Sequence, residues 1–468
     1  MLRNSLSLFL LLPFLLACET TTESTTPPSE NDTSVARSAT QDMTNGLLQN
    51  PDWSKNAVIY EVNLRQYTEE GTLTAFAERL PQLQKLGVDI LWLMPVQPIG
   101  KKNRKGELGS YYSIQDYTAI NPEYGSMEDF KALVSQAHDL GFKVILDWVA
   151  NHTAWDHVWT ETHPEWYIQD AAGNFQAPVA DWSDVIDLDY GQPALRNAMI
   201  EAMQFWVEET DVDGFRCDVA NMVPLDFWRE ARTQLNTVKR LFMLGEMSDP
   251  AYHEVFEMSY AWDLHHIFNE VAQGTKNAFD IRKQLQADQD SFPEGAYRMH
   301  FTSNHDENSW QGTTQERLGD AAESFAVLSY LLPGMPLIYS GQEAGLNKRL
   351  AFFEKDPISW PQRSRMRQIY QTLNTLVESE AALWQGPYQG SFELVNTAND
   401  ALMLVFIRRQ GNSEIVGLFN LSPAGQEVQI YGDQVKGIYQ NAFTGQSLEM
   451  VPGVTQTFEP WGYGVLVK

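Results

Sequence analysis

Short apolar runs alternate with amphipathic helical segments along most of this chain. The runs contain few polar residues, which is typical of strands buried on both faces of a parallel sheet. Eight such units over about 320 residues fit a closed barrel better than an open sheet. The predicted strands are 57–62, 88–94, 142–148, 212–217, 241–245, 256–260, 299–302 and 336–339. The predicted helices are 73–86, 127–140, 193–209, 224–235, 317–332 and 365–378. The expected class is α/β, with a (β/α)8 TIM barrel.

The alternation breaks in two places. Between 151 and 191 it gives way to a loop rich in His, Trp, Asp and Pro, which predicts a short inserted domain (about 152–190) after the third strand. In a barrel of this kind, that insertion lies on the face that carries the active site. After about residue 385, short alternating runs predict a C-terminal antiparallel β-sandwich over 385–468, so the barrel is assigned to 51–384. The strands expected in the β-sandwich are 391–395, 402–408, 415–420, 427–430 and 463–468.

The N-terminus has the features of an export signal. Arg3 precedes an apolar run from 6 to 16, which is too short to span a membrane as a mature helix. The run ends in Leu-Leu-Ala-Cys, which resembles the lipobox of bacterial lipoproteins, with Cys18 as the lipidated residue. We therefore expect a signal peptide (1–17), a lipidated, solvated tether (18–50) and a secreted lipoprotein of the bacterial outer membrane, on its periplasmic face or the cell surface. A secretory signal without lipidation is the alternative.

Charge and cysteine content narrow the range of partners. The net charge of -28 repels phosphate backbones, so we expect no nucleic-acid partner. A neutral substrate is easier to accommodate. The chain has 2 Cys, so no disulfide framework is available.

Polar residues gather just after the predicted strands. The carboxyl ends of parallel barrel strands meet on one face, so these residues are expected to line one pocket. Each of them alone has an ordinary structural explanation, such as a helix cap or an ion pair. There is no His-Glu-x-x-His spacing and no Cys cluster, so catalytic zinc is not expected. The set comprises Asp147, Asn151, His152, Arg216, Asp218, Glu246, His305 and Asp306.

Two carboxylates of different ionisation suit the cleavage of a glycosidic bond. Asp218 shares a strand face with Arg216, whose charge favours the ionised form that a nucleophile needs. Glu246 follows an apolar strand and has no basic residue immediately beside it in the sequence, so it is the candidate for the proton donor. Asp306 would hold ring hydroxyls and stabilise positive charge as the bond breaks.

Four motifs in this order resemble the signature regions of the α-amylase family of glycoside hydrolases (family 13). The similarity covers roughly residues 53–380 and extends to a run at 334–343 that is typical of the eighth strand. It implies a retaining mechanism with Asp218 as nucleophile, Glu246 as general acid/base and Asp306 as transition-state stabiliser. The motifs are 147–152, 214–221, 244–246 and 301–306.

The resemblance also implies roles for residues around the cleaved bond. It makes Arg216, His152 and His305 ligands of the sugar, Asp147 a brace for Arg216, and Tyr112 the ring that stacks on the same sugar. The family chemistry requires no cofactor.

A structural calcium is a further expectation from the family, with Asn151 and Asp187 as ligands. Met222 replaces a family His that contributes a backbone oxygen, which does not exclude calcium. An Asp-rich calcium loop found in several relatives is absent at 68–73. In the insertion, Trp155, Trp159, Trp166 and Trp182 could stack on further sugars, although a small local core is the favoured interpretation.

These features predict a lipid-anchored, monomeric retaining glycosidase that hydrolyses α-1,4 bonds in starch, glycogen or maltodextrins, with endo-acting α-amylase activity favoured. A maltodextrin glucosidase, a cyclomaltodextrinase and a 4-α-glucanotransferase share the same catalytic residues and remain alternatives. A non-catalytic α-glucan-binding lipoprotein is an alternative of another class, although pure binding does not need all three acids.

Overall fold

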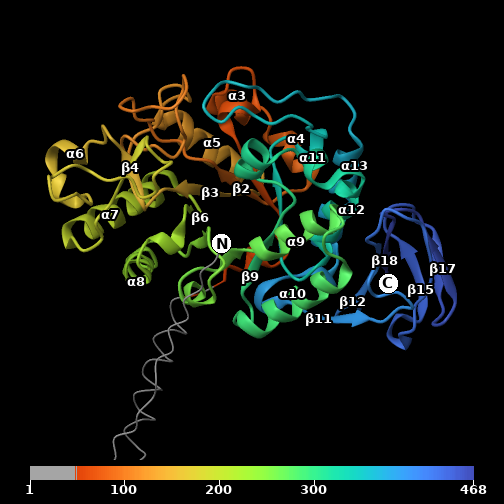
Figure 1. Cartoon of the computed structure of the whole chain (residues 1–468). Coiled ribbons are helices and arrows are strands. Elements are labelled where there is room, and N and C mark those ends of the chain that lie inside the picture. Colours follow the sequence, from red (N-terminus) through yellow and green to blue (C-terminus); the bar gives the residue numbers. More distant parts are fainter. Residues whose placement is uncertain (1–47, 49) are drawn as a thin grey trace, which may run out of the picture. The chain divides into compact units, whose positions relative to one another are not determined.

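The computed structural model describes residues 48 and 50–468 (Figure 1). The predicted signal peptide, Cys18 and nearly all of the predicted tether lie outside the described residues. Within the described part of the chain, no helix has the length and apolar character needed to cross a membrane.

Eight parallel strands close into a barrel in the order β1-β10-β9-β8-β7-β6-β3-β2, which confirms the predicted TIM barrel. Every predicted barrel strand is present. The strand expected at 299–302 begins two residues earlier, because Tyr297 and Arg298 pair with β8. The strands are β1 (Ile59–Val62), β2 (Ile90–Leu93), β3 (Lys143–Trp148), β6 (Gly214–Cys217), β7 (Phe242–Gly245), β8 (Met258–Tyr260), β9 (Tyr297–His300) and β10 (Met335–Tyr339).

The side-chain alternation of each strand divides the core in two. One set of buried residues, including Ile90, Ile145 and Leu244, forms an inner cluster. The alternate residues, including Leu91, Leu146 and Phe215, join a larger cluster with residues of the surrounding helices. Both strand faces are therefore buried, which is why the strands read as continuous apolar runs.

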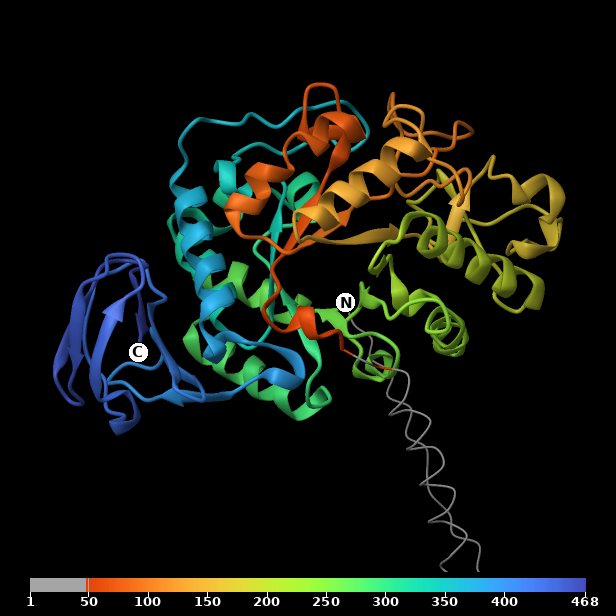
Figure 2. The same ribbon diagram turned by 180° about the vertical axis from the view of Figure 1, so that it is seen from behind.

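Helices surround the barrel (Figure 2). Two predicted helices are each divided. The segment 73–86 breaks between α3 and α4 because Pro81, at the start of α4, cannot donate a backbone hydrogen bond to the preceding turn. The segment 317–332 breaks at Gly319, which has a φ of 54°. The helices are α2 (Leu64–Tyr67), α3 (Leu73–Ala77), α4 (Leu80–Leu86), α5 (Met127–Asp139), α7 (Pro193–Thr210), α8 (Leu225–Leu235), α9 (Trp262–Ala272), α10 (Ala278–Ser291), α11 (Thr314–Leu318), α12 (Ala322–Leu331) and α13 (Arg365–Ser379).

The insertion after β3 contains a two-stranded antiparallel sheet, β4 (His152–Ala154) and β5 (Val185–Asp187), and a short helix, α6 (Trp159–Thr162). Trp166 is buried and packs against Trp159, as the local-core interpretation predicts. The Trp182 ring lies 5.5 Å from the His152 ring, so one insertion tryptophan reaches the candidate site.

The C-terminal domain contains a six-stranded antiparallel sheet and a two-stranded sheet that share one apolar core, as a sandwich does. Arg408 in β12 is fully buried and donates to the carbonyls of Leu331, Leu332 and Trp384, which joins this sheet to the end of α12. The pattern at 391–468 missed three short strands, β15 to β17. The strands are β11 (Ser391–Val395), β12 (Met403–Gln410), β13 (Ser413–Asn420), β14 (Gln426–Gln429), β15 (Gly437–Asn441), β16 (Ser447–Met450), β17 (Thr455–Phe458) and β18 (Tyr463–Val467).

Candidate active site

The candidate residues come from the carboxyl ends of four barrel strands. Asp147 and Arg216 lie near the ends of the neighbouring strands β3 and β6, where they are paired in register. Glu246 directly follows β7, and Asp306 lies on the loop after β9. Contacts in the structure join all of these residues, together with Asp218 and His305, into one cluster.

Arg216 is the centre of this cluster. Its side chain is fully buried, and its Nη1 lies 2.9 Å from Asp147 Oδ1 and 3.0 Å from Asp218 Oδ1. Its Nη2 lies 2.7 Å from Glu246 Oε2, and the guanidinium also lies over the Trp92 ring. One buried cation therefore contacts three carboxylates, including both groups expected to break the bond.

The Arg216 contacts change one expectation about ionisation. Glu246 has no basic neighbour in the sequence, but in the fold it pairs with Arg216. Burial acts to raise the pKa of Glu246, but Arg216 and the Val219 N–H outweigh it and lower that pKa. Burial raises the pKa of Asp218 well above its usual range, although Arg216 opposes the shift. The ionisation of both carboxyls therefore depends on burial and on the shared Arg216 contact, which the sequence neighbours of Glu246 do not reveal.

Val219 contacts the same Glu246 oxygen as Arg216. The Val219 N–H donates to Glu246 Oε2 at 3.0 Å. Val219 has a φ of 36°, a left-handed conformation that is rare for a β-branched residue. Strain of this kind costs on the order of 1–3 kcal/mol and concentrates at functional sites, where the surrounding structure maintains it. Here the strained turn directs a backbone donor at a candidate catalytic carboxylate.

Tyr112 and His305 form a stacked pair next to Asp147. Their ring centroids lie 5.2 Å apart at an angle of 21°. The Tyr112 hydroxyl donates to Asp147 Oδ2 at 3.0 Å and lies 2.8 Å from His305 Nε2. Trp92 Nε1 donates to the same Asp147 oxygen. Tyr112 is thus held rigidly at the barrel mouth, as a ring that stacks on a sugar must be.

Glu61 is a site residue that the sequence analysis missed. It is fully buried at the third position of β1, and its Oε1 lies 2.5 Å from His305 Nδ1. The signal was present in the sequence, since Glu61 is a charged residue inside an otherwise apolar strand. Burial acts against the charge on His305, but Asp306 and Glu61 outweigh it and raise the pKa of His305 to about 9. His305 is therefore an imidazolium below about pH 9.

We expect Glu61→Gln to move the alkaline limb of the pH–kcat/KM profile to lower pH. The groups that face His305 are Glu61, Asp306, Tyr112 and Arg216, and the substitution removes one of the two carboxylates that hold its proton. The imidazolium would then be lost at a lower pH as the pH rises. At neutral pH we expect a roughly tenfold loss of kcat/KM, equivalent to about 1.4 kcal/mol. A uniform loss across the whole pH range would contradict this role and indicate structural support alone.

His152, Asn151 and Asp187 lie together where the insertion joins the barrel. Burial lowers the pKa of His152 to about 4, so this residue is a neutral hydrogen-bonding group. Asn151 and Asp187 line a cleft of about 840 Å³ with Asp189 and Met222. Burial raises the pKa of Asp187 to about 6, and Asp189 adds to the shift.

The cleft only partly fits a calcium ion. No group of three or more His, Cys, Asp or Glu side chains in the described part of the chain is arranged to hold a metal. Calcium takes six to eight oxygen ligands, so backbone carbonyls and water would have to supply most of them. The partly buried Asp187 carboxylate, which has no ion-pair partner among the described residues, is the feature that favours a cation there.

Comparisons with known proteins agree with this geometry. The family model described as "Alpha amylase, catalytic domain" matches residues 34–173 and 162–380. The alpha-amylase MalA of Haloarcula japonica is 29% identical over 68% of this chain, but the match covers 48% of MalA, so this chain spans about half the length of that relative.

Two solved structures share both fold and sequence with this chain. The noncanonic maltogenic alpha-amylase AmyB of Thermotoga neapolitana is 30% identical, covers 88% of this chain and 98% of its own, and superposes with a TM-score of 0.82. An alpha-amylase of Lactobacillus plantarum is 33% identical, covers 88% and 99% of the two chains, and has a TM-score of 0.80. With its closed barrel, its buried arginine and its three acids at the strand ends, the chain belongs to the alpha-amylase family of glycoside hydrolases.

Proposed function

We propose that this protein hydrolyses α-1,4-glucosidic bonds in starch, glycogen or maltodextrins with retention of configuration. The observation that carries the proposal is the single Arg216 guanidinium that contacts both Asp218 and Glu246. This places the two carboxylates within one small site, as a retaining enzyme requires.

In the first step, an Asp218 oxygen attacks C1 of the sugar while the bond from C1 to the glycosidic oxygen breaks. Glu246 gives its proton to that oxygen, and a β-glycosyl ester of Asp218 forms. In the second step, Glu246 takes a proton from water, which attacks C1 and releases Asp218. Asp306 stabilises the positive charge that develops on the sugar.

The directions in which the pKa values of Asp218 and Glu246 are shifted are compatible with these steps. Asp218 and Glu246 are buried beside one cation, so they titrate as a pair rather than independently. A glycosidic oxygen that approaches Glu246 can accept a hydrogen bond only from the protonated acid. Substrate binding therefore favours the state in which the proton has moved to Glu246 and Asp218 is ionised against Arg216.

Product analysis tests this function. The protein with Cys18→Ser is incubated with maltoheptaose and with soluble starch, and the products and their anomeric form are followed by chromatography and early-time NMR. Mixed short α-anomeric oligosaccharides support an endo-acting retaining amylase. Glucose alone, or products longer than maltoheptaose, would instead indicate the glucosidase or the glucanotransferase alternative. Glucan binding without turnover would contradict an enzymatic function.

A calcium ion bound by Asn151 and Asp187 is part of the same proposal. We expect EDTA to lower Tm by several degrees, because removal of the ion leaves the partly buried Asp187 carboxylate without a counter-charge. Asp187→Asn should lose this response. Asp226→Asn, in the same cleft but with an exposed carboxylate that pairs with Arg196, should keep it. A Tm unchanged by EDTA in the unmodified protein would argue against the ion.

Membrane anchoring through Cys18 is a proposal from the sequence motif alone. The full chain expressed in a bacterium should sediment with membranes and dissolve in detergent, whereas Cys18→Ser should leave it in the soluble extract. Identical partitioning of the two proteins would exclude lipidation at this residue.

A further inference from the structure

Trp310 is exposed, unlike the other tryptophans. Its side chain is 50% exposed, and it is the only tryptophan among the large exposed apolar side chains of the described residues. It lies four positions after Asp306, on the loop that follows β9. A flat aromatic ring exposed beside an active site offers a surface on which a sugar ring can stack.

The backbone that carries Trp310 is rigidly held. Residues Glu307–Gln311 (η5) form a π-helix, which the Gly312 N–H closes by donating to the Glu307 carbonyl at 2.8 Å. The side-chain amide of Asn308 donates a hydrogen bond to the Lys348 carbonyl and accepts one from the Leu350 N–H. Short π-helical turns occur frequently at functional sites. Trp310 is therefore exposed on a fixed support and not on a loose loop.

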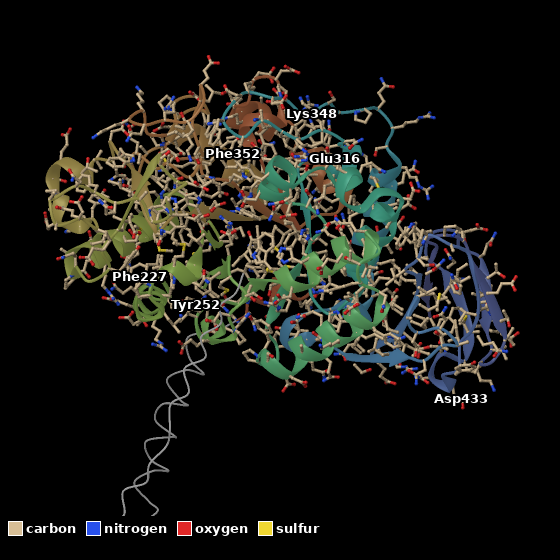
Figure 3. All side chains as sticks on the ribbon, in the orientation of Figure 1. Phe227, Tyr252, Glu316, Lys348, Phe352 and Asp433 are labelled. Atoms are coloured by element: carbon tan, nitrogen blue, oxygen red, sulfur yellow. The ribbon has the colours of Figure 1, made fainter. Side chains whose placement is uncertain are left out.

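The ring of Trp310 extends an aromatic wall, which we define as Tyr112, Phe352 and Trp310. Phe352 lies nearly parallel to Tyr112, with ring centroids 6.4 Å apart and an interplanar angle of 17°. Trp310 packs on Phe352 at 5.1 Å. Phe352 and Lys348, both labelled in Figure 3, lie on the loop whose backbone is bonded to Asn308. The wall therefore runs from the ring expected to stack on the cleaved sugar out to solvent.

Trp310 is also joined to the candidate active site through Phe352, whose ring lies 6.4 Å from the rings of both Tyr112 and His305. Asp306, which would hold the hydroxyls of the cleaved sugar, directly precedes the π-helical turn that carries Trp310. A second glucose, linked to the first, would lie within reach of the exposed surface of this ring.

We propose that Trp310 is the stacking platform for the glucose unit adjacent to the one that is cleaved, and that it makes the enzyme prefer oligosaccharides to single glucose units. The apolar C–H surface of a pyranose packs well on an indole, and the ring is already held in place, so little ordering entropy is lost on binding. This inference rests on the proposed function, because it assigns a further subsite to the same substrate.

The test compares a long and a short substrate. α-Glucosyl fluoride carries one glucose and a small leaving group, so it occupies only the cleavage position, whereas maltoheptaose extends across the wall. We expect Trp310→Ala to lower kcat/KM for maltoheptaose by about tenfold or more and to leave α-glucosyl fluoride within about twofold. Trp310→Phe should restore most of the loss. In a Glu246→Gln background, Trp310→Ala should weaken maltoheptaose binding by a similar factor.

A matched control is Phe279→Ala, which removes a comparably exposed ring (54%) at the start of α10 and should change neither substrate. Equal losses on both substrates would show that Trp310 acts only by orienting Asp306, and no loss on either would exclude contact with sugar. Either result overturns the inference while leaving the proposed function intact. That function fails separately, if the unmodified protein cleaves no α-glucan.

Discussion

Replacing Asp218 with Asn is expected to lower kcat on maltoheptaose by at least about 10⁴-fold, because an amide cannot form the glycosyl ester. Asp218 is well placed for this role, since its Oδ1 lies 3.0 Å from a buried guanidinium that favours the attacking anion. The measurement is reducing-sugar release from maltoheptaose at several pH values. Substrate affinity should change much less than kcat.

A smaller substitution makes this prediction sharper. Asp218→Ala leaves a cavity on the face from which the carboxylate attacks, and azide can enter it. With α-glucosyl fluoride, azide then attacks C1 from that face and gives β-glucosyl azide. Asp226→Ala, which removes an exposed carboxylate of α8, should retain full activity and give no azide product. Substantial activity in Asp218→Asn would show that another group is the nucleophile.

The barrel could be predicted because its strands are buried on both faces, which leaves a nearly continuous apolar pattern in the sequence. The carboxyl ends of these strands meet on one face of the barrel. The positions of Asp218, Glu246 and Asp306 just after three predicted strands therefore predict that they share one site. The exact bounds of helices and the short strands were harder to predict from the sequence. The division of the helix at Pro81 could have been expected from the proline alone, whereas the three short C-terminal strands β15 to β17 have little burial pattern to detect.

Contacts between strands explain what the sequence could not show. Glu61 and His305 are 244 positions apart in the sequence and meet only because β1 and β9 both pair with β10 when the barrel closes. Arg216 reaches Glu246 across the parallel pair β6 and β7, although no basic residue neighbours Glu246 in the sequence. Ionisation depends on these contacts, so the sequence can group the acids but cannot show that Arg216 pairs with Glu246.

The second decisive experiment is Glu246→Gln, which tests whether Glu246 donates a proton to the leaving oxygen. We expect kcat on maltoheptaose to fall by about 10³–10⁴-fold, because the leaving sugar oxygen needs a proton that glutamine cannot give. Fluoride leaves without a proton, so α-glucosyl fluoride should still form the ester with Asp218 at nearly the normal rate. Water then lacks its base, so the ester should accumulate and be detected as a glucosyl adduct by mass spectrometry.

The azide products distinguish the faces on which the two carboxylates act. In Glu246→Ala the ester on Asp218 still forms, and azide replaces water on the opposite face to give α-glucosyl azide, the mirror of the Asp218→Ala result. If Glu246 instead acts only as the fixed anion that the free structure shows, held by Arg216 and the Val219 N–H, its replacement should slow both substrates equally. A loss of activity on maltoheptaose alone, whose leaving sugar oxygen needs a proton, therefore requires that Glu246 is protonated once the substrate is bound. Asp218 and Glu246 titrate as a pair, so a proton can move between them when the substrate binds.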